Sequence, residues 1–116
     1  MYELEFYSTE KGVEPIREFL DSLTPKLRAK AIRDLEILQE YGNNLREPHS
    51  KYIEDGIFEL RIKFSSDIAR IFYFFIVGNK IILTNGFIKK QQKTPKREIE
   101  RAKTYKKEFE RRQCND

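Results

Sequence analysis

The stretch spanning residues 56–95 constrains the fold more than any other part of the chain, because it holds three apolar runs separated by two short polar breaks. Apolar and charged residues alternate in the first run, 57–64, which is the period-two pattern of a strand with one buried face. The second run, 68–77, is almost continuously apolar and aromatic, as expected of a strand that is covered on both faces. The third run, 80–88, follows after a Gly-Asn dipeptide, which favours a type II′ hairpin turn. The stretch therefore predicts a three-stranded antiparallel meander.

Two arginines in this meander stand out. Arg61 lies on the polar side of the first strand, and Arg70 lies in the apolar second strand, where a guanidinium cannot be buried unpaired. A four-residue turn at 64–67 places Arg70 opposite Arg61, and pairing of Val77 with Lys80 sets the register of the third strand. In this register one face gathers five charged residues: Glu59, Arg61, Lys63, Arg70 and Lys89. The simplest interpretation is a solvated basic face with the glutamate as its counter-ion, and a binding site is the alternative.

Helix-start signals flank the meander. Pro15 suits the first turn of a helix, and Thr-Pro pairs at 24–25 and 94–95 combine an N-cap residue with a proline at the first helical position. Apolar residues at helical spacing then predict an αα-hairpin over 15–41 and a highly charged helix from 95 to about 112.

These elements predict one α+β domain covering residues 1–116. Residues 2–7 alternate like a first strand, so the sheet is expected to combine this N-terminal strand with the meander in a small antiparallel sheet. The αα-hairpin and the C-terminal helix would pack against that sheet. Residues 43–55 are expected to form a loop, and this loop carries the only histidine, His49. A histidine in a polar loop is an ordinary surface residue unless the fold brings it to a site, where it could act as a general base.

Charge and cysteine content narrow the function classes. The net charge of +4 is concentrated in residues 89–112, where Lys and Arg far outnumber Glu, so we expect an anionic partner such as nucleic acid, the ribosome or an acidic protein. The single Cys114 allows no internal disulfide and fits a reducing, cytoplasmic compartment. One Cys and one His argue against a zinc site, and no cofactor is expected. The longest apolar run is too short to span a membrane.

Three motifs follow one another in the second half of the chain: GIFELR at 56–61, ARIFY at 69–73 and IILTNGFIKKQQKTPKREIERA at 81–102. In this order they resemble the RelE/HigB-type toxins of bacterial type II toxin–antitoxin systems, and most closely the phage-derived HigB-like branch. The resemblance implies a RelE-like fold with a basic cleft that cuts mRNA on the ribosome without a metal. It also implies a cognate antitoxin, expected to be a helix-turn-helix DNA-binding protein, that wraps or blocks this cleft.

The resemblance carries over residue by residue to the two meander arginines and to Lys89, Lys90 and Lys93. RNA can be cleaved without metal when its 2′-hydroxyl attacks the adjacent phosphate, and preorganised cations stabilise the anionic transition state. The candidate catalytic residues are therefore Arg61, Arg70, Lys90 and Glu59. The candidate RNA-binding residues are Lys63, Lys89, Lys93 and Tyr73. Glu59 is the best local carboxylate for a general base, and Tyr73 could stack a base if it faces the cleft, the alternative being a core tyrosine.

Two other functions fit the same fold. A ParE-like inhibitor of DNA gyrase would use the basic face to bind protein, with no RNA chemistry. A non-catalytic regulator would only bind the antitoxin. The clustered Arg and Lys side chains favour the nuclease, because a protein-binding surface does not need phosphate-type donors on a sheet. The antitoxin is expected either to cover the basic face with an acidic segment or to pack over the first two helices.

Overall fold

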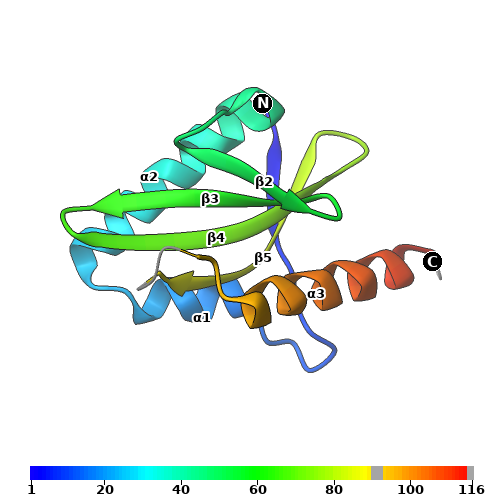
Figure 1. The fold of residues 1–116 in the computed structure, drawn as a ribbon. Helices are drawn as coiled ribbons and strands as arrows, with labels where there is room; N and C mark the ends of the chain where they lie inside the picture. The colour runs from blue at the N-terminus through cyan, green and yellow to red at the C-terminus, as the bar shows by residue number, and fades with distance from the viewer. Residues whose placement is uncertain (90–92, 115–116) are drawn as a thin grey trace.

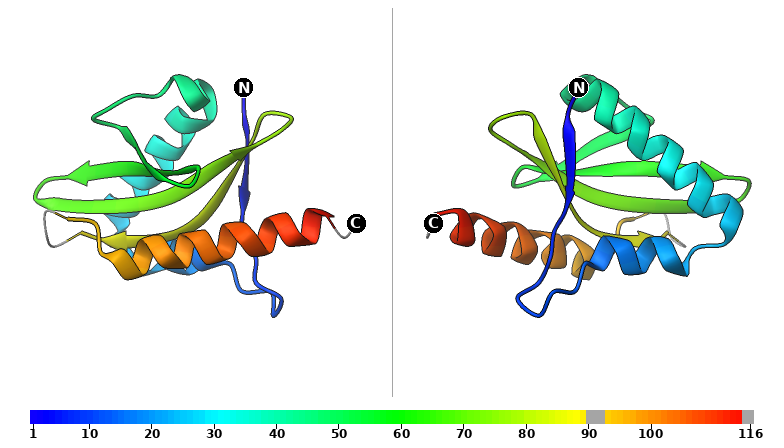
Figure 2. Two further views of the ribbon diagram at one scale, coloured as in Figure 1. Left: turned by 45° about the vertical axis from the view of Figure 1, so that its right-hand side comes forward. Right: turned by 180° about the vertical axis from the view of Figure 1, so that it is seen from behind.

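The structure, a computed structural model, describes residues 1–89 and 93–114 and confirms an α+β fold (Figure 1). Its elements, in chain order, are β1 (Glu3–Phe6), α1 (Pro15–Ser22), α2 (Pro25–Tyr41), the 3₁₀ turn η1 (Gly42–Asn44), β2 (Ser50–Glu54), β3 (Ile57–Phe64), β4 (Asp67–Ile76), β5 (Lys80–Ile88) and α3 (Lys96–Cys114). Helices α1 and α2 cover one face of the sheet and α3 lies across the other (Figure 2). Within the described ranges, no helix has the length and apolar character needed to cross a membrane.

The sheet has the strand order β1-β5-β4-β3-β2, and β3, β4 and β5 form the predicted antiparallel meander with β4 at its centre. Two details differ from the sequence prediction. Strand β1 pairs parallel with β5, so the sheet is mixed rather than wholly antiparallel. Residues 50–54, predicted as part of a loop, form the edge strand β2 against β3. The prediction missed β2 because an edge strand of five residues with three exposed positions carries little apolar signal.

The first hairpin of the meander has the predicted register. Phe64 pairs with Asp67, and Arg61 lies directly opposite Arg70. The second hairpin differs: Ile76, not Val77, pairs with Lys80, so its loop has three residues. Both Gly78 and Asn79 take positive φ values, 92° and 65°, so the predicted two-residue type II′ turn, which has a positive φ only at its first central residue, does not form.

A β-bulge in β5 compensates for this longer loop. Tyr73 pairs with Leu83 but Ile71 pairs with Gly86, so two residues of β5, Thr84 and Asn85, oppose one residue of β4. The bulge shifts the register by one residue. The far end of the hairpin therefore has the register that the sequence predicted, with Arg70 opposite Phe87.

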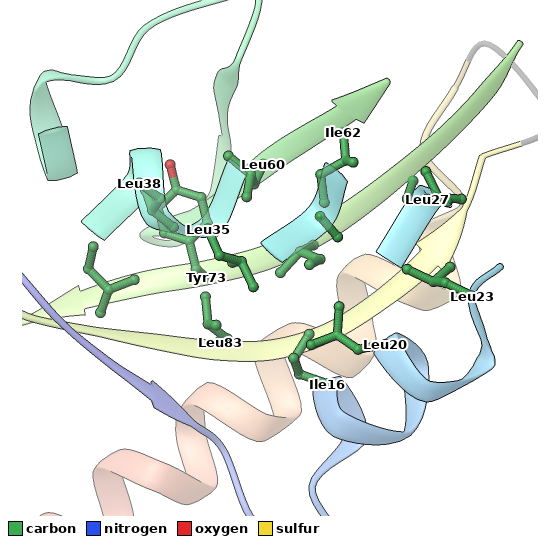
Figure 3. Packing of buried hydrophobic residues seen from close by; sticks show 14 residues of the cluster. Ile16, Leu20, Leu23, Leu27, Leu35, Leu38, Leu60, Ile62, Tyr73 and Leu83 are labelled. Carbon is green, nitrogen blue, oxygen red and sulfur yellow. The ribbon is translucent and has the colours of Figure 1, made fainter. Parts of the chain in front are cut away.

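The larger core lies between the sheet and the αα-hairpin (Figure 3). Thr24 begins α2 as predicted, because its hydroxyl accepts a hydrogen bond from the Leu27 backbone N–H at 3.4 Å. Helix α1 approaches β5 closely at Gly86, where an added Cβ would lie 2.4 Å from the Phe19 ring. Glycine at this position therefore sets how tightly α1 packs on the sheet.

A smaller core lies between the opposite face of the sheet and α3. It is built from β-strand aromatics such as Phe72 and Phe74 against Ala102 and Phe109 of the helix. Helix α3 begins near the middle of this face and does not extend over the end near the β3–β4 turn (Figure 1). That end carries the charged residues that the sequence placed on one face.

Candidate nucleic-acid interface

A buried ion pair lies at the end of the sheet that α3 does not cross. Glu59 of β3 is 1% exposed, and its Oε1 accepts a hydrogen bond from Arg70 Nη1 of β4 at 2.5 Å. Its Oε2 accepts a hydrogen bond from the Thr94 hydroxyl, just before α3, at 2.8 Å. Both carboxylate oxygens are thus engaged, and Glu59 ties the start of α3 to Arg70. A buried carboxylate with both oxygens hydrogen-bonded holds its partners in place, and neither oxygen is free to accept a proton from a substrate.

The two arginines carry hydrogen-bond donors that lack acceptors. Arg61 and Arg70 are cross-strand neighbours, an arrangement that repels without a counter-ion. Arg70 is 6% exposed, and burial, opposed in part by Glu59, lowers the pKa of its guanidinium. Among the residues that the structure describes, the buried Nε atoms of both arginines have no hydrogen-bond partner. Buried N–H groups are nearly always paired, so these two need an acceptor that the described residues do not supply.

Further cations surround this pair. Lys89 lies on the same face as Arg70, because its backbone N–H bonds the carbonyl of Ile68 at 2.8 Å and continues the β4–β5 ladder. Burial lowers the pKa of the Lys89 ammonium, and the positive charges of Arg70, Arg61 and Lys51 lower it further. Lys63 is exposed on the same face toward the turn. We call the set Lys51, Arg61, Lys63, Arg70 and Lys89 the cationic face.

The cationic face has the character of an anion site. Its five cations surround a single buried carboxylate, that of Glu59, on the same face of the sheet. Glu59 holds the Arg70 guanidinium, Arg61 lies beside it on the adjacent strand, and such planar donors match the oxygens of a phosphate. The described residues contain no group of three or more His, Cys, Asp or Glu side chains that could hold a metal ion.

Other predicted site residues lie elsewhere. Lys93 is exposed before α3, and Lys90 lies outside the described residues. Tyr73 does not face the cationic face, because side chains alternate along β4 and only the Arg70 side faces it. It is 1% exposed in the core under α2 (Figure 3), and its hydroxyl forms a hydrogen bond with Ser50. The core alternative for Tyr73 is therefore the one that the structure bears out.

Strand β2 brings two residues to the site that a loop would not have placed there. Lys51 pairs with Glu59 and so belongs to the cationic face. The backbone carbonyl of His49 accepts a hydrogen bond from the backbone N–H of Arg61 at 2.8 Å. His49 therefore lies across from Arg61 on the neighbouring chain segment. His49 is exposed. The only sequence signal for β2, and so for the position of both residues, is the alternation of Ser50, Lys51 and Tyr52. An alternation over three residues is too short to predict a strand by itself.

A family model described as phage derived protein Gp49-like (DUF891) matches residues 18–107, a range that holds the whole cationic face. The chain belongs to this family. The Gp49-like family is a known family of toxin-like proteins of phage origin, which agrees with the coarse assignment that the sequence motifs suggested. No curated protein matches the chain.

Proposed function

We propose that this Gp49-like chain is a RelE/HigB-type toxin, a ribosome-dependent and metal-independent endoribonuclease that cleaves mRNA and stops translation. One observation carries the proposal: Arg61 and Arg70 lie side by side on adjacent strands, each with a buried Nε that has no hydrogen-bond partner among the described residues, on a face that also gathers three lysines. Such a site fits a phosphate whose negative charge increases during the reaction.

The reaction follows from these donors. The 2′-hydroxyl of one nucleotide attacks its own 3′-phosphate, the bond to the next 5′-oxygen breaks, and the products are a 2′,3′-cyclic phosphate and a 5′-hydroxyl. Arg61 and Arg70 stabilise the phosphorane, in which the phosphate oxygens carry more charge than in the substrate. We assign protonation of the leaving 5′-oxygen to Lys89 in place of Lys90, which lies outside the described residues, because Lys89 lies on the same face as Arg70 and the lowered pKa of its ammonium favours that transfer. Lys51, Lys63, Lys90 and Lys93 hold the RNA backbone.

The general base is assigned differently from the sequence hypothesis. Glu59 is buried and both of its carboxylate oxygens are hydrogen-bonded, so we assign it the role of positioning Arg70. His49 is exposed across from Arg61, which supports it as the group that receives the 2′-hydroxyl proton. A base on a short edge segment gives weak catalysis until the RNA is oriented, and the ribosome would supply that orientation.

The cognate antitoxin, proposed as a helix-turn-helix protein, neutralises this surface. An acidic segment laid over the cationic face would satisfy the unpaired arginine donors directly. The same charges leave one rival: a gyrase inhibitor would bind an acidic protein surface with this face and cleave no RNA.

Induction of the chain in a bacterial host, followed by mapping of mRNA ends, tests the proposal. Arg61→Ala is the informative variant because Arg61 makes no side-chain hydrogen bond to the described residues, and Arg33→Ala on the exposed side of α2 is its matched control. We expect cleavage within translated messages for the wild type and for Arg33→Ala, and loss of cleavage for Arg61→Ala at unchanged stability. Growth arrest with intact mRNA would contradict the nuclease and favour gyrase. Harmless expression of the folded wild type would leave only the regulator.

A further inference from the structure

A pocket of about 460 Å³ lies on the other face of the sheet, beyond the end of α2. Its walls are the segment 42–47, strand β2 and the aromatic residues Phe58, Tyr73 and Phe75 of β3 and β4. We propose that this pocket binds one base of the RNA strand whose phosphate occupies the cationic face. The inference rests on the proposed function and adds a substrate contact to it.

The aromatic lining suits a flat ring. The Phe58 ring packs nearly parallel to Tyr73, with centroids 5.6 Å apart, and Tyr52 stands against Phe58 at an angle of 71°. Tyr52 is 54% exposed, so its ring forms an open wall rather than part of the core. Aromatic rings that border a cavity of this size accept nucleobases irrespective of sequence, because every base has a π-face.

The floor of the pocket holds a polar group with spare capacity. The hydroxyls of Tyr73 and Ser50 form one buried hydrogen bond with each other, and both residues line the pocket. Two hydroxyl groups carry two protons, and one bond uses one of them. Neither hydroxyl bonds any other side chain or backbone group among the described residues. The remaining proton has no acceptor there, and a ring nitrogen or carbonyl of a base would supply one.

The pocket and the cationic face are joined by one exposed strand edge. β2 is the last strand of the sheet, and successive residues point to opposite faces: Lys51 toward Glu59, Ser50 and Tyr52 toward the pocket. A single strand of RNA that passes over this edge can leave a phosphate on one face and place a base some nucleotides further along the strand in the pocket on the other. Arg46, Glu47 and Lys51 also line the pocket, so its rim carries two positive charges and one negative charge.

Titration of the isotope-labelled chain with nucleotides by NMR tests the proposal. The probes are the four nucleoside 5′-monophosphates, with ribose 5-phosphate as the ligand that lacks a base. We expect the amides of the pocket residues Phe58, Tyr73 and Phe75 to shift more with nucleotides than with ribose 5-phosphate, which should shift mainly the amides of the cationic face. Tyr52→Ala should weaken binding at least about fivefold, the equivalent of one lost stacking contact. Tyr52→Phe keeps the ring, and Tyr41→Ala removes an equally exposed tyrosine that does not line the pocket, so both should bind like the wild type.

The outcomes separate this proposal from the proposed function. Shifts confined to the cationic face would show phosphate binding alone and overturn the base pocket, while mRNA cleavage would stand on its own assay. Equal shifts with ribose 5-phosphate would overturn it as well, as would no shifts in the pocket at saturation of the cationic face. The amides of the pocket residues could also show no shift with nucleotides and become protected from hydrogen exchange only in the complex with the antitoxin. That result would overturn the base pocket and identify the pocket as a protein-binding surface.

Discussion

The Glu59–Arg70 pair makes a quantitative prediction about stability. In Glu59→Gln the shape of the side chain is kept, but Arg70, with 7% of its side chain exposed, loses its counter-ion. Breaking a buried pair from one side destabilises a protein by about 3–5 kcal/mol. Because Arg70 borders the open cationic face, solvent screens part of this charge, and we expect a value near the lower limit, about 3 kcal/mol.

Urea unfolding followed by circular dichroism measures this change. With a slope of about 1–3 kcal/mol per molar urea, a loss of 3 kcal/mol lowers the midpoint by roughly 1–3 M. Thr94→Val removes only the second bond to the same carboxylate, which is worth about 1.5–3 kcal/mol at most. The double variant Glu59→Met/Arg70→Met replaces both charges with apolar groups and should regain most of the stability lost in Glu59→Gln. It should nevertheless remain inactive.

The reasoning would be refuted if Glu59→Gln stayed within about 1 kcal/mol of the wild type, because the pair would then carry no buried charge interaction. It would also be refuted if the double variant were less stable than Glu59→Gln. In that case each side chain would contribute to stability through its own packing and not through the ion pair.

Three further predictions concern the rest of the fold. Burial and the Glu108 carboxylate raise the pKa of Tyr7 to about 12. The unfolded state therefore loses this proton near pH 10 and the folded state does not, so stability should fall between pH 10 and 12 by up to about 3 kcal/mol more than in Tyr7→Phe, measured by urea unfolding at each pH. Gly86→Ala should destabilise by about 1–3 kcal/mol because its Cβ would overlap Phe19, and a thermal melt that matches the wild type would exclude this overlap. Thr24→Ala should cost about 1 kcal/mol through the lost N-cap of α2, and a matching Thr24→Ser variant should restore it in the same assay.

The meander was predictable because its signals are redundant. Alternation in β3, the apolar run of β4 and a four-residue first turn all agree, and together they set Arg61 opposite Arg70. The predicted register of the second hairpin is correct at the end far from its loop, but for a reason that the sequence did not reveal. The loop is one residue longer than predicted, and the bulge at Thr84 and Asn85 returns the register to the predicted one. The one sequence signal for the bulge is Gly86, which follows it directly inside an otherwise apolar strand, but a single glycine does not fix where a register shift occurs.

The candidate site was predictable only in part. The charged face follows from alternation, and the same alternation was enough to place Tyr73 on the opposite side from Arg70. The burial of Glu59 was not predictable, because it depends on a tertiary hydrogen bond from Thr94, which lies just before α3 and far from Glu59 in the sequence. Lys51 and His49 depended on β2, whose pairing with β3 is tertiary rather than local.

The central claim is that Arg61 and Arg70 stabilise the transition state of mRNA cleavage on the ribosome. The most direct measurement is the single-turnover rate at which the purified chain cleaves mRNA held on programmed ribosomes, for the wild type, Arg61→Ala and the exposed control Arg97→Ala. We predict that Arg61→Ala lowers this rate by about 100- to 1000-fold, that Arg97→Ala leaves it unchanged, and that free mRNA is not cleaved. A rate that Arg61→Ala leaves unchanged, or the absence of ribosome-dependent cleavage by the folded wild type, would contradict the claim.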